Sequence, residues 1–296
     1  MQTGIDPKVD YAFKRVFGSD ENREILLSLL NAVLMSSDTR PLREVEILNP
    51  FSHKETLDDR LAILDIKAID DQGREFLVEM QMVAHEFFRE RLLFYLAKDY
   101  AQQLHEGEQW EKLRPVIVVC FINDVLCQET TGYHGRYELL DPDTQVRFSK
   151  HWTIHIFELP KFHKSVTELA TDIERWNYFL QHGNELDPDN LPLPLQNPSI
   201  RQATGVLQKM SLNTLERDQY EARLRFQRDE HSRLTTVLGK ERRDVILRIG
   251  TKRLGPPPAE VVPQLNAVTN LDRLLELQDR ILDCATWEAL FDGGSQ

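Results

Sequence analysis

The feature that most constrains the fold is a pair of strand-like segments joined by a short turn. Residues 61–70 and 74–82 alternate polar and apolar side chains, and Asp71, Gln72 and Gly73 connect them. A three-residue connection that ends in glycine is typical of a type I turn followed by a left-handed residue. The two segments are therefore predicted to form a β-hairpin whose register is set by this turn.

The predicted register places two acidic side chains beside each other. Counting outward from the turn puts Asp65 opposite Glu79, with Lys67 and Gln81 on the same side of the hairpin. Because side chains alternate between the two faces of a strand, these four polar residues share one face. The residues between them are largely apolar and are expected to face a core.

Two opposed carboxylates repel each other unless a positive charge lies between them. Mg²⁺ and Mn²⁺ prefer carboxylate oxygens, and such an ion can polarise a phosphoryl oxygen and lower the pKa of a bound water molecule. Asp65 and Glu79 are therefore candidate metal ligands. Gln81 is a candidate for orienting a water molecule or holding a phosphate, and Lys67 for stabilising negative charge.

The same residue types are also ordinary on the solvent-exposed face of an antiparallel sheet. Acidic, basic and amide side chains need no ligand in that position. Spacing alone does not separate this interpretation from a metal site.

The rest of the chain shows helical and strand periodicities around the hairpin. Apolar residues repeat at helical spacing over residues 9–17 and 25–34, which predicts two core-packing helices before the first strand. The expected elements after the hairpin are a helix at 86–106, a buried strand at 115–122, strands at 136–140 and 153–158, and helices from residue 165 onward. Arg89 and Arg91 lie near the start of the helix after the hairpin. They could contact a phosphate there, but a solvated helix face is the more common role of such residues.

Composition narrows the function classes. A net charge of −12 argues against a protein that only coats nucleic acid, although it leaves room for an enzyme that acts on it. The three cysteines form no CxxC or Cys/His cluster, so structural zinc is not expected. The sequence has no apolar run of roughly 20 residues and no secretory signal, so we expect no membrane span and a cytoplasmic location.

Several segments resemble a known group of nucleases. LDIKA at residues 64–68 and VEMQ at residues 78–81 resemble the core of the PD-(D/E)XK nuclease superfamily. DPKVDYAFKRVFG at residues 6–18 resembles, more narrowly, the Rpn family of recombination-promoting nucleases, which is also described as a transposase family. Further matches are Tyr95, Tyr100, Gln103, Leu104 and Gly107, followed by LRPVI at residues 113–117.

The resemblance implies an α/β fold with a restriction-endonuclease-like core, in which a mixed sheet is flanked by helices. It also implies cleavage of DNA that depends on Mg²⁺ or Mn²⁺. Carried over to this chain, Asp65 and Glu79 are the metal ligands, and Gln81 stands where the superfamily has a catalytic lysine. Glutamine carries no positive charge, so either another group compensates or the rate is low.

Asp10 and Lys14 belong to the segment that resembles the N-terminal signature. They are four residues apart and share one helix face. The resemblance implies an active-site role, with Asp10 near the metal and Lys14 near phosphate. A surface pair that supports the helix is the alternative.

The chain is expected to contain three parts. These are a nuclease-like domain at 1–165, a helical extension at 166–235 with a linker near 187–198, and a small all-α domain at 236–296. The last part resembles a helical domain of unknown function found in bacterial members of this group, and it is a candidate for homo-oligomerisation. The favoured function is a Mg²⁺-dependent DNA endonuclease linked to recombination or mobile elements. The alternative is a weakly active or inactive nuclease-fold protein that acts as an interaction module.

Overall fold

The computed structural model describes residues 1–35, 41–49, 65–84 and 86–291. Residues 61–64 of the predicted first hairpin strand lie outside the described residues. The chain divides into two compact units, Met1–Arg223 and Leu224–Gln296. No described helix combines the length and the apolar character that a membrane span requires.

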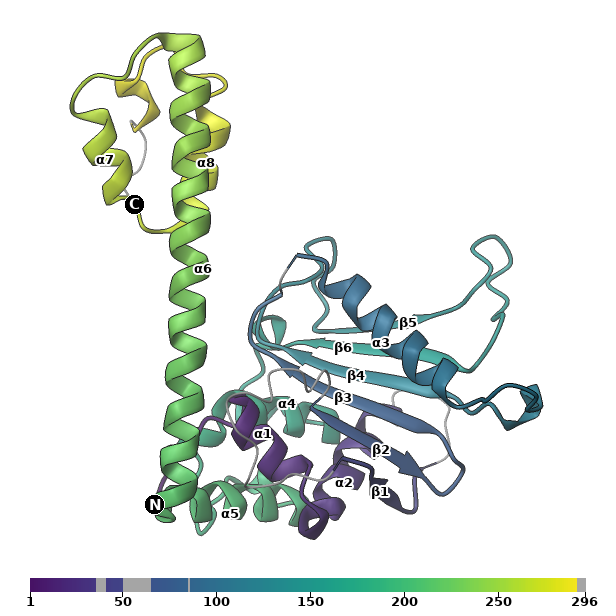
Figure 1. The fold of residues 1–296 in the computed structure, drawn as a ribbon. Coiled ribbons are helices and arrows are strands. Elements are labelled where there is room, and N and C mark those ends of the chain that lie inside the picture. The colour runs from purple at the N-terminus through teal and green to yellow at the C-terminus, as the bar shows by residue number, and fades with distance from the viewer. Residues whose placement is uncertain (36–40, 50–64, 85, 292–296) are drawn as a thin grey trace. The chain divides into compact units, whose positions relative to one another are not determined.

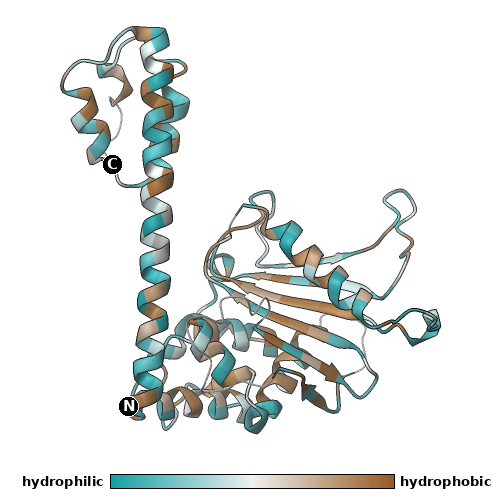
Figure 2. Cartoon of the chain, in the orientation of Figure 1, coloured by the Kyte–Doolittle hydropathy of each residue, from teal (hydrophilic) through white to brown (hydrophobic). Residues whose placement is uncertain are grey.

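The first unit is built on a six-stranded mixed sheet with the strand order β1-β2-β3-β4-β6-β5 (Figure 1). Strands β3, β4 and β6 are parallel, and the remaining neighbours are antiparallel. The strands are β1 Val45–Ile47, β2 Ile66–Asp70, β3 Glu75–Gln81, β4 Val116–Ile122, β5 His134–Glu138 and β6 Trp152–Glu158. Every residue of β4 is buried, as the continuous apolar run predicts (Figure 2).

The hairpin of β2 and β3 has the predicted register. Ile66 pairs with Val78 and Lys67 pairs with Leu77. Gly73 has a φ of +76°, which is the left-handed residue that the turn requires. The next pair outward in this register is Asp65 and Glu79, so the turn places these two residues opposite each other.

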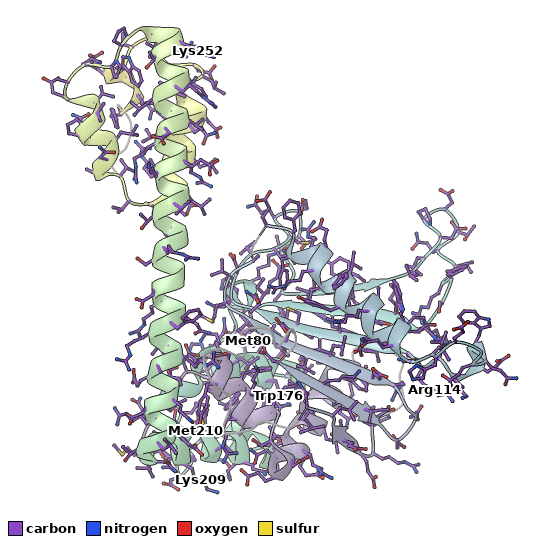
Figure 3. The ribbon with its side chains drawn as sticks, in the orientation of Figure 1. Met80, Arg114, Trp176, Lys209, Met210 and Lys252 are labelled. Carbon is purple, nitrogen blue, oxygen red and sulfur yellow. The ribbon has the colours of Figure 1, made fainter. Side chains whose placement is uncertain are left out.

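Helices cover both faces of the sheet. Helix α3 (Phe88–Gln102) packs Phe88, Leu92 and Leu96 against residues of β3 and β4. The other face is covered by α1 (Asp10–Phe17), α2 (Arg23–Leu34), α4 (Asp172–His182) and α5 (Pro198–Leu212). Trp176 of α4 is 1% exposed and makes edge-on ring contacts in this layer (Figure 3). The expected α/β fold with a mixed sheet between helices is confirmed.

Helix α6 (Thr214–Leu254) begins in the first unit, where its first turns contact α1. Gln219 accepts a hydrogen bond from the Tyr11 hydroxyl, and Arg223 Nη1 lies 3.9 Å from Asp10 Oδ2. Helices α4 and α5 belong to the same compact unit as the sheet.

The second unit has a small core of its own. The end of α6, α7 (Val261–Ala267) and α8 (Leu271–Arg280) pack around Trp287 and neighbouring apolar side chains. A Cβ atom on Gly250 would lie 2.1 Å from the Trp287 ring, so only glycine fits at this position. Hydrophilic residues alternate with intermediate and hydrophobic ones along α6 (Figure 2).

Candidate active site

Asp65 and Glu79 meet at the end of the hairpin that is distant from the turn. Asp65 directly precedes β2, and its backbone N–H donates to Glu79 Oε2 at 3.3 Å. The backbone N–H of Met80 donates to Asp65 Oδ2 at 2.7 Å. Glu79 is 8% exposed, so the pair does not lie on a solvent-exposed sheet face. The two carboxylates are held together by backbone donors within a largely buried site.

The burial of this pair changes its acid–base chemistry. Burial raises the pKa of Asp65 to about 6, and the nearby charge of Lys14 partly opposes this shift. Burial and the charge of Asp65 also raise the pKa of Glu79 well above its usual value, while Arg91 opposes the shift. Two buried carboxylates with raised pKa values favour a further cation between them.

Helix α1 presents both of its candidate residues to this site. Lys14 Nζ lies 3.7 Å from Asp65 Oδ1, and the Lys14 side chain is 12% exposed. The negative charge of Asp10 contributes to raising the pKa of Asp65. The apolar face of α1, which includes the fully buried Phe13 and Phe17, packs into the core and turns the Asp10 and Lys14 face toward Asp65.

Arg91 of α3 is a site residue that the sequence interpretation assigned mainly to a solvated helix face. Its Nη2 atom lies 3.7 Å from Glu79 Oε1 and donates to Gln81 Oε1 at 2.9 Å. A signal for this placement exists in the sequence, because Arg91 lies one turn after Phe88 and directly before Leu92. Both of those residues are buried, so Arg91 flanks the face that packs on the sheet.

Gln81 is placed beside the pair, but its amide has protein partners on both sides. The oxygen accepts from Arg91, and Nε2 donates to the backbone carbonyl of Val83 at 2.8 Å. Lys67 lies on the predicted face but belongs to a different cluster. Its ammonium lies 2.8 Å from Asp99 and 3.0 Å from Glu75, and no contact among the described residues joins it to Asp65 or Glu79.

The two carboxylates fit a magnesium-type ion. Mg²⁺ in proteins is commonly held by one or two carboxylates, with water and substrate phosphates completing its coordination. Within the described ranges, no three His, Cys, Asp or Glu side chains gather into a fuller metal-binding cluster. Asp65 and Glu79 are therefore the residues that would hold the ion, with the rest of its coordination left for water and substrate.

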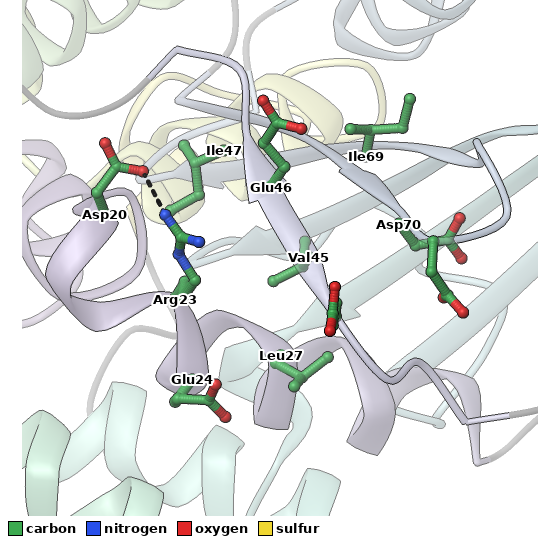
Figure 4. A pocket seen from close by; sticks show the side chains of 11 residues that line it. Asp20, Arg23, Glu24, Leu27, Val45, Glu46, Ile47, Ile69 and Asp70 are labelled. Carbon is green, nitrogen blue, oxygen red and sulfur yellow. Dashed lines mark hydrogen bonds and ion pairs between the residues drawn. The ribbon is translucent and has the colours of Figure 1, made fainter.

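A cavity of about 730 Å³ lies at the other end of the hairpin, between the start of α2 and strands β1 and β2 (Figure 4). Its lining includes Arg23 but is dominated by acidic residues, which are Asp20, Glu24, Glu44, Glu46, Asp70 and Asp71. A phosphate backbone is repelled by such a surface. This cavity is therefore unsuited to nucleic acid, and the candidate site for phosphate chemistry is the Asp65 and Glu79 pair.

The first unit thus combines a mixed sheet between helices with paired carboxylates at the end of its hairpin. The sequence model of PD-(D/E)XK nuclease family transposases matches residues 7–237, and the chain belongs to this family. Nucleases of this family generally use divalent metal ions and act on DNA. Comparisons with curated proteins and with solved structures find no match. Residues 238–296 lie outside the family match.

Proposed function

We propose that this protein is a Mg²⁺-dependent DNA endonuclease, with Mn²⁺ as an alternative ion, that serves recombination or mobile elements. The observation that carries the proposal is the buried carboxylate pair. The backbone N–H of Asp65 donates to Glu79 Oε2 at 3.3 Å, and burial raises the pKa of both side chains. Such a pair is costly to maintain in a protein without a cation.

Each residue around the pair has a defined task in this proposal. Asp65 and Glu79 hold the ion, which when bound polarises a phosphoryl oxygen and lowers the pKa of water. Lys14 and Arg91 lie beside the carboxylates and add positive charge where a phosphate would approach. Hydrolysis adds the oxygen of one water molecule to phosphorus and breaks the bond to the leaving sugar oxygen. The proton lost by the water balances the proton gained by the leaving oxygen.

Cleavage of a supercoiled plasmid tests the proposal. A closed circle has no strand ends, so an endonuclease can cut it and an exonuclease cannot. We expect nicked and linear products with Mg²⁺ or Mn²⁺ and none in EDTA. Asp65→Asn and Glu79→Gln keep the side-chain shape and are expected to reduce cleavage at least about 100-fold. Glu46→Gln, in the acidic cavity, is the matched control and is expected to cleave normally. Cutting in EDTA, or full activity of Asp65→Asn, would contradict the proposal.

The biological role is supported by the family description as transposases. Breaks made by an endonuclease are substrates for recombination, so a role in that process needs no strand-transfer activity. We expect recombination between marked DNA segments to rise in cells that express the wild-type protein and not in cells that express Asp65→Asn. Equal recombination with both proteins would contradict this role while leaving the cleavage proposal intact.

A second candidate function is that of an interaction module with weak or absent cleavage. Two observations favour it: residue 81 carries no charge, and residues 238–296 lie outside the family match yet help to form a separate core. This function predicts self-association through the C-terminal helices and no plasmid cleavage with any divalent ion. Light scattering on the full chain, run beside the cleavage assay, distinguishes the two functions. A monomer that cleaves DNA would contradict the second.

A further inference from the structure

We propose that Arg91 stabilises the phosphate during cleavage and that Gln81 is the positioning residue that holds Arg91. The inference rests on the proposed nuclease function and assigns the contact with the reacting phosphate to a residue of helix α3. It starts from the Nη2 atom of Arg91, which lies 2.9 Å from Gln81 Oε1 and 3.7 Å from Glu79 Oε1. One guanidinium thus contacts both a proposed metal ligand and the residue two positions after it.

The hydrogen bonds of Gln81 give it a connecting role. Its Nε2 atom donates to the carbonyl of Val83, and its oxygen accepts from Arg91. This pattern fixes the orientation of the amide, because only the NH₂ group can donate to a carbonyl and only the oxygen can accept from arginine. Gln81 therefore links the backbone after β3 to the guanidinium, and it holds that group beside Glu79.

Arg91 is also the more accessible of the two cations beside the pair. Its side chain is 36% exposed, whereas that of Lys14 is 12% exposed. Among the described residues, both contacts of the guanidinium with acceptors, to Gln81 and to Glu79, are made by Nη2. The Phe88 ring, 5.2 Å from the guanidinium carbon, supports the group from the helix side.

The chemistry of the guanidinium suits this task. It is planar, always charged and carries five donors that match the oxygens of a phosphate. Charge on those oxygens increases as the phosphorus is attacked, and a donor already in place stabilises the transition state more than the bound substrate. Lys67 is held by Glu75 and Asp99 instead, so it is not in position to take this role.

The test compares Arg91→Gln, Arg91→Lys and Gln81→Ala in plasmid cleavage with Mn²⁺. Arg91→Gln is expected to lower kcat at least about 100-fold, whereas Arg91→Lys keeps the charge and is expected to retain about a tenth of the activity. Binding of a labelled duplex in Ca²⁺, followed by fluorescence anisotropy, is expected to weaken less than about tenfold in Arg91→Gln. A loss in kcat with little loss in affinity is the signature of a transition-state contact.

The double variant tests the positioning role of Gln81. Gln81→Ala alone is expected to lower kcat about tenfold, and the double variant with Arg91→Gln is expected to be no slower than Arg91→Gln alone. Arg89→Gln is the matched control on the same helix, because Arg89 donates to the Leu126 carbonyl and is directed away from the pair. It is expected to cleave as the wild type does.

The outcomes separate this inference from the function on which it rests. A wild-type protein that cleaves DNA while Arg91→Gln cleaves equally well overturns the inference alone. Multiplicative losses in the double variant overturn the positioning role of Gln81. Equal losses in Arg91→Lys, Arg91→Gln and Arg89→Gln, together with a lower melting temperature, indicate a structural role and also overturn it. A wild-type protein that cleaves with no divalent ion overturns the proposed function itself.

Discussion

Replacing Asp65 by asparagine is expected to stabilise the metal-free protein at the same time as it removes activity. The pKa of Asp65 is about 6 in the folded protein, against an ordinary value of 3.8. A difference of about 2 in pKa corresponds to about 3 kcal/mol between the protonated and ionised forms. That value is the upper limit of the penalty that the folded protein carries when Asp65 is ionised.

The sign of the effect follows from which state holds the proton more tightly. Because the pKa is higher in the folded protein, the favourable contribution is fully present below pH 3.8 and is lost as the pH rises through 6. Asparagine never ionises and escapes this loss, but it gives up the ion pair with Lys14. We therefore expect Asp65→Asn to be about 1–2 kcal/mol more stable than the wild type at pH 8 and nearly equal at pH 4.

Urea unfolding in EDTA, followed by circular dichroism at pH 4 and pH 8, measures this difference. Asp71→Asn, at an exposed position in the turn, is the control and is expected to change stability by less than about 0.5 kcal/mol. Adding Mg²⁺ at pH 8 is expected to stabilise the wild type and not Asp65→Asn, because only the wild type retains both carboxylates. A variant that is less stable at pH 8, or a difference that is equal at both pH values, would refute the reasoning.

Two further predictions concern packing away from the site. Gly250→Ala places a Cβ atom 2.1 Å from the Trp287 ring, and it is expected to destabilise the second unit by about 1–3 kcal/mol, seen as faster hydrogen exchange in α8. Gly205→Ala, where no atom lies within 4 Å of the new Cβ, is the matched control and is expected to be neutral or stabilising by up to about 1 kcal/mol. Asp70→Ala removes the partner of the buried Arg74 guanidinium at 2.7 Å, and is expected to lower the unfolding free energy of the first unit by about 3–5 kcal/mol in urea titrations. Wild-type stability of this variant would show that the pair contributes little to the hairpin.

The hairpin and its carboxylates could be predicted from sequence because the determining interactions are local. Three residues of turn set the register, and counting from Gly73 is sufficient to bring Asp65 beside Glu79. The same counting does not show that the face is buried. Burial of this face depends on α3, which packs against it. The connection that leads into α3 ends at Phe87, which has a left-handed conformation with a φ of 61°.

The residues that the sequence interpretation placed less well are those whose partners are distant in the chain. Lys67 was expected to serve the phosphate, yet its ammonium is bound by Asp99, which lies 32 residues away on α3. Arg91 was weighed mainly as a solvated side chain because helical periodicity locates a face but not what that face meets. Gln81 was expected to contact water or phosphate, but its amide oxygen accepts a hydrogen bond from Arg91, which lies on the following helix.

The contacts between α1 and the beginning of α6 have an entropic consequence for the site. Helix α1 packs its apolar face into the core, while Tyr11 and Asp10 are engaged by Gln219 and Arg223 of α6. A helix held on two sides loses little freedom when a ligand arrives, so Lys14 reaches Asp65 without a further ordering cost. In this sense the first turns of α6 preorganise the charge of Lys14, which lies about one turn along α1 from Asp10 and Tyr11.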